Sequence, residues 1–237
     1  MLSWWLGFRG TGGPLVATRV GREDPAVSGP GGREASSATA ESAARRGSGL
    51  LAQRSFLEVR FGGSGGQGVI LMGVILAMAA ARDHRYVVQT QSYGPEARGG
   101  YSRSDVIISD SQIDYPELQG IDLLVVLSQA AADHYVGLLR ATGVFVFDAE
   151  RVASPPRFRG PSYGVPFVRL AVEETGREQV ANVLTLGAVV ALTGVVSAQS
   201  LRQAVADVVP KGTEEWNERA LSRGLALRAE EWLRSNA

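Results

Sequence analysis

The chain has 237 residues, and 45% of them are hydrophobic, which is enough for one large domain or two small ones with a substantial core. It contains no cysteine, which excludes a disulfide, a thiol nucleophile, and a zinc ion or iron–sulfur cluster bound by thiolates. Lysine plus arginine and aspartate plus glutamate both total 24, so no net charge attracts nucleic acid or an acidic membrane. We therefore expect binding to neither.

Residues 1–54 differ in composition from the rest of the chain. They are rich in glycine, proline, serine and alanine, as in Gly29-Pro30-Gly31-Gly32, and no apolar periodicity runs through them. Such a segment buries too little apolar surface to offset the entropy of ordering, so we predict a disordered extension or a miscalled translation start. Met1–Phe8 has no leading cation and too short an apolar run for a secretory signal. We expect a cytoplasmic protein whose domain covers residues 55–237.

A strand, a glycine-rich loop and a helix open the predicted domain. The β-like run Phe56–Phe61 leads into Gly62–Gly68, and a long apolar helix follows as far as Arg82. Further strands are predicted over residues 105–109, 121–127 and 143–148, with a helix over 129–140. Because such apolar runs are typical of strands buried on both faces, we predict an α/β, three-layer, Rossmann-like fold. Its sheet is expected to be mostly parallel, with helices on both faces.

An uncharged stretch lies between Glu178 and Arg202, long enough to be tested as a membrane span. Several polar side chains interrupt it, and Gly194 followed by Ser197 is typical of a helix end and a new helix start. We predict two buried helices there and no membrane span. A last, amphipathic helix is predicted over residues 214–234.

The glycine loop is suited to binding an anion, because glycines let the backbone approach a ligand and the following helix points its free amides at it. The alternative is a turn that serves packing only. No lysine followed by serine or threonine is present for a Walker A loop, and no acidic residue on a second strand supports a conventional NAD site. The candidate cofactor-binding residues, with coenzyme A as a possible ligand, are Gly63, Ser64, Gly65, Gly66, Gln67 and Gly68.

A second unusual stretch, residues 89–105, is polar, rich in turn formers and bracketed by aromatic and charged residues. We interpret it as a recognition loop in which Arg98 and Arg103 bind anions or carboxylates; an ordinary surface loop is the alternative. Its candidate interface residues are Tyr93, Gly94, Pro95, Glu96, Arg98, Gly99, Gly100, Ser102 and Arg103. Neither His84 nor His134 has metal-ligand spacing, and no serine lies in a G-x-S-x-G elbow, so we predict no metal or catalytic residue.

Taken together, these motifs are specific enough to indicate a protein family. The chain resembles the gamma subunit of 2-oxoacid:ferredoxin oxidoreductases over about residues 56–228, and Tyr93-Gly94-Pro95-Glu96-Ala97-Arg98-Gly99-Gly100 is the most specific part of the likeness. The other matching segments are Gly63–Gly68, Ser102–Val106, Ile113–Pro116, Ala181-Asn182, Leu186–Ala188, Asn217, Ala220 and Gly224.

The resemblance implies a complex that oxidatively decarboxylates a 2-oxoacid with coenzyme A, giving an acyl-CoA, carbon dioxide and reduced ferredoxin. It places thiamine diphosphate, Mg²⁺ and [4Fe-4S] clusters on partners: the alpha and beta subunits, a ferredoxin-like subunit, and ferredoxin itself. This chain has neither a Gly-Asp-Gly motif for magnesium-bound thiamine diphosphate nor a cysteine, so we expect a subunit that holds none of these cofactors alone.

The role expected for this subunit is assembly through the segment from Tyr93 to Ser104, together with positioning of the nucleotide end of coenzyme A by the glycine loop. The favoured substrate is 2-oxoglutarate, with pyruvate, branched-chain and aryl 2-oxoacids as alternatives. Two other interpretations stay open: the equivalent subunit of an indolepyruvate oxidoreductase, and a standalone Rossmann-like nucleotide-binding protein without redox activity.

Overall fold

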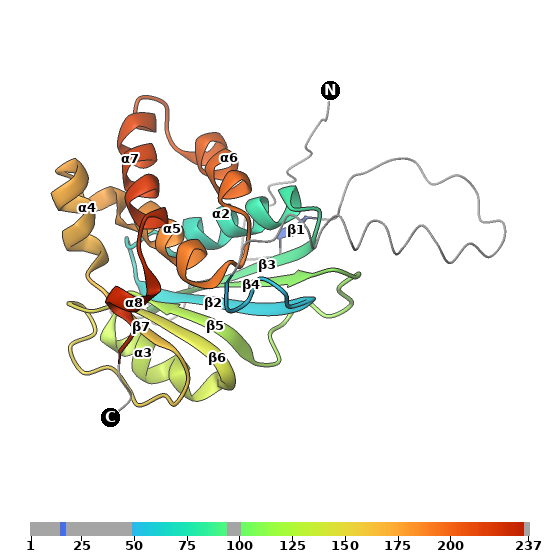
Figure 1. Cartoon of the computed structure of the whole chain (residues 1–237). Coiled ribbons are helices and arrows are strands. Elements are labelled where there is room, and N and C mark those ends of the chain that lie inside the picture. The colour runs from blue at the N-terminus through green and yellow to red at the C-terminus, as the bar shows by residue number, and fades with distance from the viewer. Residues whose placement is uncertain (1–14, 18–48, 94–100, 235–237) are drawn as a thin grey trace, which may run out of the picture.

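The computed structural model describes residues 15–17, 49–93 and 101–234, which form a sheet covered by helices (Figure 1). The strands are β1 (Leu15–Ala17), β2 (Phe56–Ser64), β3 (Tyr86–Tyr93), β4 (Tyr101–Ser109), β5 (Ile121–Val126), β6 (Leu139–Asp148) and β7 (Ser162–Val165). The helices are α2 (Val69–Arg82), α3 (Gln129–Tyr135), α4 (Phe167–Thr175), α5 (Ala181–Thr193), α6 (Ala198–Val208), α7 (Glu214–Leu225) and α8 (Ala229–Trp232). Two short 3₁₀ turns, η1 (Val136–Leu138) and η2 (Glu178–Val180), precede β6 and α5.

The strands form one sheet in the order β1-β3-β4-β2-β5-β6-β7. The half from β2 to β7 is parallel, whereas β1, β3, β4 and β2 pair antiparallel. The predicted α/β class is confirmed. The sheet is mixed, however, where the sequence predicted a mostly parallel one.

The antiparallel half arises from the polar stretch that the sequence analysis interpreted as a loop. Gln89–Tyr93 and Tyr101–Ser104 belong to β3 and β4, with Tyr93 opposite Ser102. The buried Gln89 side chain donates a hydrogen bond from Nε2 to Oγ of Ser104 over 2.8 Å. The Gln89 amide nitrogen therefore finds an acceptor on the neighbouring strand, and the polar residues of both strands hide them from an apolar pattern.

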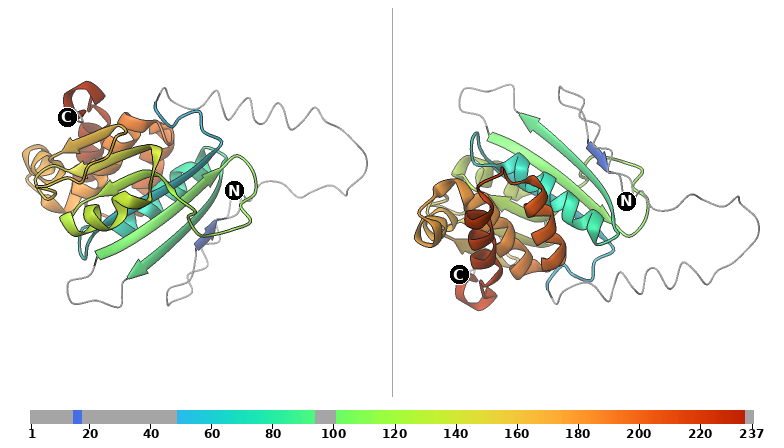
Figure 2. Two further views of the ribbon diagram at one scale, coloured as in Figure 1. Left: turned by 90° about the horizontal axis from the view of Figure 1, so that it is seen from below. Right: turned by 90° about the horizontal axis from the view of Figure 1, so that it is seen from above.

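Helices cover both faces of the sheet, but unequally (Figures 1 and 2). One face packs against α2 and α4–α7, and its core includes Phe61 of β2, Val125 of β5 and Val146 of β6. The other face packs against α3 and contributes a smaller core around Leu124 and Phe145. The prediction of helices on both faces is confirmed.

The uncharged stretch forms two helices, as predicted. Gly194 ends α5 with a left-handed φ of 67°, and the Ser197 side chain accepts the amide hydrogen of Ser200 at the start of α6. None of the helices in the described part of the chain is both long and apolar enough to span a membrane. The predicted helix over 214–234 is wrong in one respect: the chain turns after Leu225 to bury Leu227, and a separate short helix follows.

Two other boundaries differ from the sequence-based prediction. The helix expected over 129–140 ends at Tyr135, and β6 begins at Leu139, before the predicted start at residue 143. Residues 49–54, assigned above to the extension, pack on the domain: Leu51 and Ala52 are buried, and the Leu51 amide donates to the carbonyl of Thr193 over 2.8 Å. The rest of the expected extension, apart from β1, lies outside the described residues.

A buried ion pair joins the central strand β2 to its antiparallel neighbour β4. Arg60 donates from Nε and Nη2 to the two carboxylate oxygens of Asp105, each over 2.7 Å. Both side chains are less than a tenth exposed, and the Tyr135 ring of α3 lies 4.8 Å from the guanidinium. The two hydrogen bonds compensate for the desolvation of both charges, so loss of one partner would leave the other charge buried and unpaired.

We expect Asp105→Ala to lower the free energy of unfolding by about 3–5 kcal/mol, because it leaves the Arg60 charge buried without a partner. Urea unfolding of the full chain, followed by circular dichroism, measures this loss. The control is Glu150→Ala, which breaks the exposed pair with Arg169 at 2.9 Å and is expected to cost less than about 1 kcal/mol. Equal losses in the two variants would contradict the importance of the buried pair.

Candidate functional site

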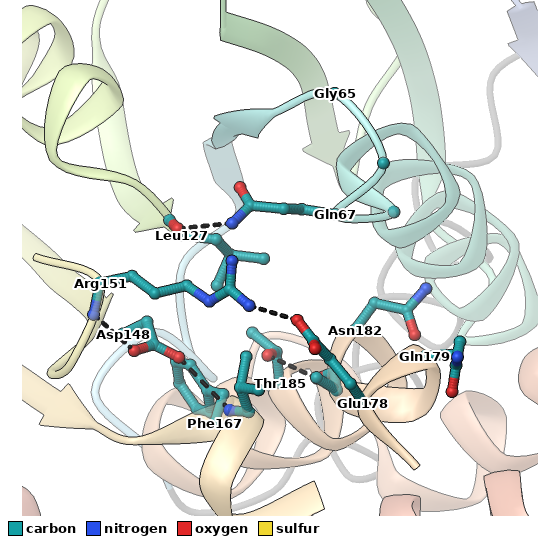
Figure 3. Close-up of a pocket in the computed structure, with 14 residues that line it drawn as sticks. Gly65, Gln67, Leu127, Asp148, Arg151, Phe167, Glu178, Gln179, Asn182 and Thr185 are labelled. Atoms are coloured by element: carbon teal, nitrogen blue, oxygen red, sulfur yellow. Dashed lines mark hydrogen bonds and ion pairs between the residues drawn. The ribbon is translucent and has the colours of Figure 1, made fainter.

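A pocket of about 380 Å³ opens at the carboxyl ends of β2, β5 and β6 (Figure 3). This is the edge at which open α/β sheets bind ligands. Helices α2 and α5 begin at its walls. The described residues that line it are Gly65, Gly66, Gln67, Gly68, Leu127, Asp148, Arg151, Phe167, Val168, Glu178, Gln179, Ala181, Asn182 and Thr185.

The glycine loop forms one wall and is held in place by Gln67. The Ser64 amide donates to Oε1 of Gln67 over 2.6 Å, and Nε2 of Gln67 donates to the carbonyl of Leu127 over 2.8 Å. Gly63 and Ser64 extend β2, so the turn itself comprises residues 65–68. The side chain of Gln67 thus fastens this turn to the end of β5.

Gly68 is required at the start of α2. Its φ is +71°, and a Cβ there would lie 2.4 Å from Nδ2 of Asn182, at the first turn of α5. A Cβ added at Gly65 or Gly66, by contrast, would have nothing within 4 Å, and both glycines border the pocket. The loop therefore packs through Gly68 and leaves the backbone of Gly65 and Gly66 open to a ligand, close to the free amides at the start of α2.

The opposite wall is organised by Asp148 at the end of β6, to which the sequence analysis assigned no role. Its carboxylate is fully buried and accepts the amide hydrogens of Glu150 and Arg151, each over 3.0 Å, and that of Val168 over 3.4 Å. Asp148 therefore fixes the turn after β6 and the start of α4. Its role in this wall of the pocket is structural.

Arg151 and Glu178 are two pocket residues that the sequence analysis missed. The guanidinium of Arg151 crosses the pocket and forms an ion pair with the carboxylate of Glu178, as Figure 3 shows. Position was the available signal for Arg151, since it lies three residues after the end of a parallel strand. Glu178 comes from the turn before α5, which no local pattern relates to β6.

The predicted recognition segment meets the glycine loop at the same edge of the sheet. Tyr101 pairs with Ser64 and Ser102 with Gly63, so the end of β3 and the beginning of β4 adjoin the glycine loop. Arg103 is 43% exposed, with Nε 4.0 Å from a carboxylate oxygen of Asp105. Of the predicted interface residues, Gly94, Pro95, Glu96, Arg98, Gly99 and Gly100 lie outside the described residues.

The two histidines lie away from the pocket lining. His84 follows α2, and His134 in α3 makes an edge-to-face contact with Tyr135 at 4.8 Å between ring centroids. Within residues 15–17, 49–93 and 101–234, no three histidine, aspartate or glutamate side chains are grouped so that they could hold a metal ion. The pocket lining combines the backbone of the glycine loop, amide side chains, one arginine and the carboxylates of Asp148 and Glu178.

Known proteins share this architecture. The family model for pyruvate ferredoxin/flavodoxin oxidoreductase matches residues 58–227. The 2-oxoglutarate synthase subunit KorC of Methanocaldococcus jannaschii is 48% identical over 73% of this chain and 94% of its own length. The keto/oxoacid ferredoxin oxidoreductase gamma subunit of Geobacter sulfurreducens is 41% identical, with a TM-score of 0.69 over 76% of this chain and 100% of that one.

A solved structure with lower sequence identity shares the same fold. Subunit PORC of the pyruvate oxidoreductase from Thermotoga maritima is 26% identical, with a TM-score of 0.61 over 76% of this chain and 98% of its own. The matched span contains the glycine loop, the Arg60–Asp105 pair and the start of α5. The resemblance stated from the motifs is therefore confirmed, and the chain belongs to the pyruvate ferredoxin/flavodoxin oxidoreductase family.

Proposed function

We propose that this chain is the gamma-type subunit of a cytoplasmic 2-oxoacid:ferredoxin oxidoreductase whose substrate is 2-oxoglutarate. The observation that carries the proposal is the 48% identity to a 2-oxoglutarate synthase subunit over 94% of that subunit's length. Such a complex converts the 2-oxoacid and coenzyme A to an acyl-CoA and carbon dioxide while reducing ferredoxin.

The proposal assigns thiamine diphosphate, Mg²⁺ and [4Fe-4S] clusters to the alpha and beta subunits and to a ferredoxin-like subunit. This chain has no cysteine to ligate a cluster. Its own contribution would be assembly, through the hairpin that includes Tyr93, Ser102 and Arg103, and binding of the nucleotide portion of coenzyme A in the pocket.

The size and the glycine wall of the pocket support the coenzyme A part of the proposal. Its volume of about 380 Å³ suits a nucleotide fragment, and the loop offers an uncovered backbone at Gly65 and Gly66. The start of α2 has no side-chain cap, so its first-turn amides add donors that favour a phosphate group. Coenzyme A would supply the acyl-accepting thiol, while this chain binds and orients its phosphate-bearing end.

The substrate and the partners are tested together by affinity purification. With a tag on the C-terminus and anaerobic conditions, we expect thiamine-binding and cluster-bearing chains to co-elute, and 2-oxoglutarate with coenzyme A to reduce a viologen dye. Mass spectrometry identifies the chains, and a panel of 2-oxoacids tests the substrate. Faster reduction with pyruvate or an aryl 2-oxoacid would contradict 2-oxoglutarate; elution of the chain alone would favour a standalone nucleotide-binding protein.

The coenzyme A contact is tested by Gly65→Ala. The new methyl group enters open space and needs no positive φ, so it changes the ligand-facing surface without straining the loop. We expect the KM of the complex for coenzyme A to rise about fivefold, equivalent to about 1 kcal/mol, with kcat unchanged. The control is Gly137→Ala in η1, where an added Cβ also has nothing within 4 Å. Equal KM values for coenzyme A in the two variants would contradict coenzyme A binding in this pocket.

The assembly role is tested by Arg103→Ala. Because this arginine is exposed beside the glycine loop, its loss is expected to reduce the yield of intact complex several-fold without lowering the thermal stability of the isolated chain. Arg219→Ala on α7, where the arginine is 48% exposed, is the matched control. Size-exclusion chromatography measures the yield, and equal yields for the two variants would argue against an interface at this hairpin.

A further inference from the structure

We propose that Arg151 is the phosphate-binding side chain of the pocket and that Glu178 holds it until a ligand phosphate displaces the Glu178 carboxylate. This inference rests on the proposed function, since the phosphate is taken to belong to the nucleotide portion of coenzyme A. The ion pair between the two side chains would then be the closed state of the site, and phosphate binding would exchange one anion for another.

Arg151 is placed for this task by its backbone. Its amide hydrogen is bound by the buried Asp148 carboxylate over 3.0 Å, so the start of the side chain is fixed while the guanidinium crosses the pocket (Figure 3). Among the described lining residues it is the one basic side chain. The planar guanidinium can donate two parallel hydrogen bonds to a phosphate group.

The two carboxylates of the pocket differ in their availability to Arg151. Asp148 is fully buried, and its oxygens accept the amides of Glu150, Arg151 and Val168, so its charge is already compensated. Glu178 is 60% exposed and can turn into water without a desolvation penalty. An exposed ion pair of this kind changes an equilibrium by less than about tenfold, so a doubly charged phosphate can displace the carboxylate.

The glycine loop supplies the second half of the phosphate site. Gly65 and Gly66 line the pocket without side chains, and α2 begins directly after the loop with no side-chain cap on its first-turn amides. A phosphate group between the loop and Arg151 would receive hydrogen bonds from both walls. Neither wall alone provides both a full positive charge and backbone donors.

The test measures the affinity of the full-length chain for coenzyme A, ADP and pantetheine by isothermal titration calorimetry. We expect Glu178→Gln to strengthen binding of coenzyme A and ADP about twofold to fivefold, because it removes the competing anion. Arg151→Gln is expected to weaken both about tenfold or more. The double variant should resemble Arg151→Gln alone, and pantetheine, which has no phosphate, should respond to none of the changes.

Glu218→Gln is the matched control, because Glu218 pairs with Arg202 at similar exposure, outside the pocket lining. It should leave all three affinities unchanged. If the wild-type chain binds coenzyme A but Glu178→Gln weakens binding or leaves it unchanged, the exchange is refuted while the coenzyme A role stands. If neither the wild-type chain nor its complex binds coenzyme A or ADP, and Gly65→Ala leaves the KM for coenzyme A unchanged, both proposals fail.

Discussion

The two-sided pairing of β2 is the constraint on which the rest of the site depends. This strand runs parallel to β5 and antiparallel to β4, so its carboxyl end adjoins the end of one neighbour and the beginning of the other. The glycine loop and the β3–β4 hairpin therefore meet at one edge of the sheet. The buried Arg60–Asp105 pair links β2 to β4 with two charge-assisted hydrogen bonds and so stabilises this register.

The glycine loop is positioned by α2 as well as by β2, and α2 is held at both ends. At its start, Gly68 packs against Asn182 of α5. At its end, the Asp83 carboxylate accepts hydrogen bonds from the amide and hydroxyl of Ser197, each over 2.7 Å, and from the Ser200 hydroxyl over 2.6 Å. The helical layer therefore supports the loop through contacts at both ends of α2.

The two walls of the pocket follow a common plan. On each wall, the hydrogen bonds of one polar side chain hold the backbone in place: Gln67 does so in the loop and Asp148 at the end of β6. The ligand contacts proposed above are the backbone at Gly65 and Gly66 and the side chain of Arg151. The groups that hold each wall in place are thus separate from the groups proposed to contact the ligand.

The sequence by itself determined the α/β class, the strand–loop–helix opening, the two helices divided at Gly194, and the family, because apolar periodicity, helix-capping residues and the Tyr93–Gly100 motif are local features. Tertiary structure alone decided that β3 and the first half of β4, before residue 105, are strands, because their polar residues give no apolar pattern and pair across the sheet, as Gln89 does with Ser104. It also decided the pairing of Arg151 with Glu178, since these residues come from separate elements and meet only when the carboxyl ends of the strands are brought together with the start of α5.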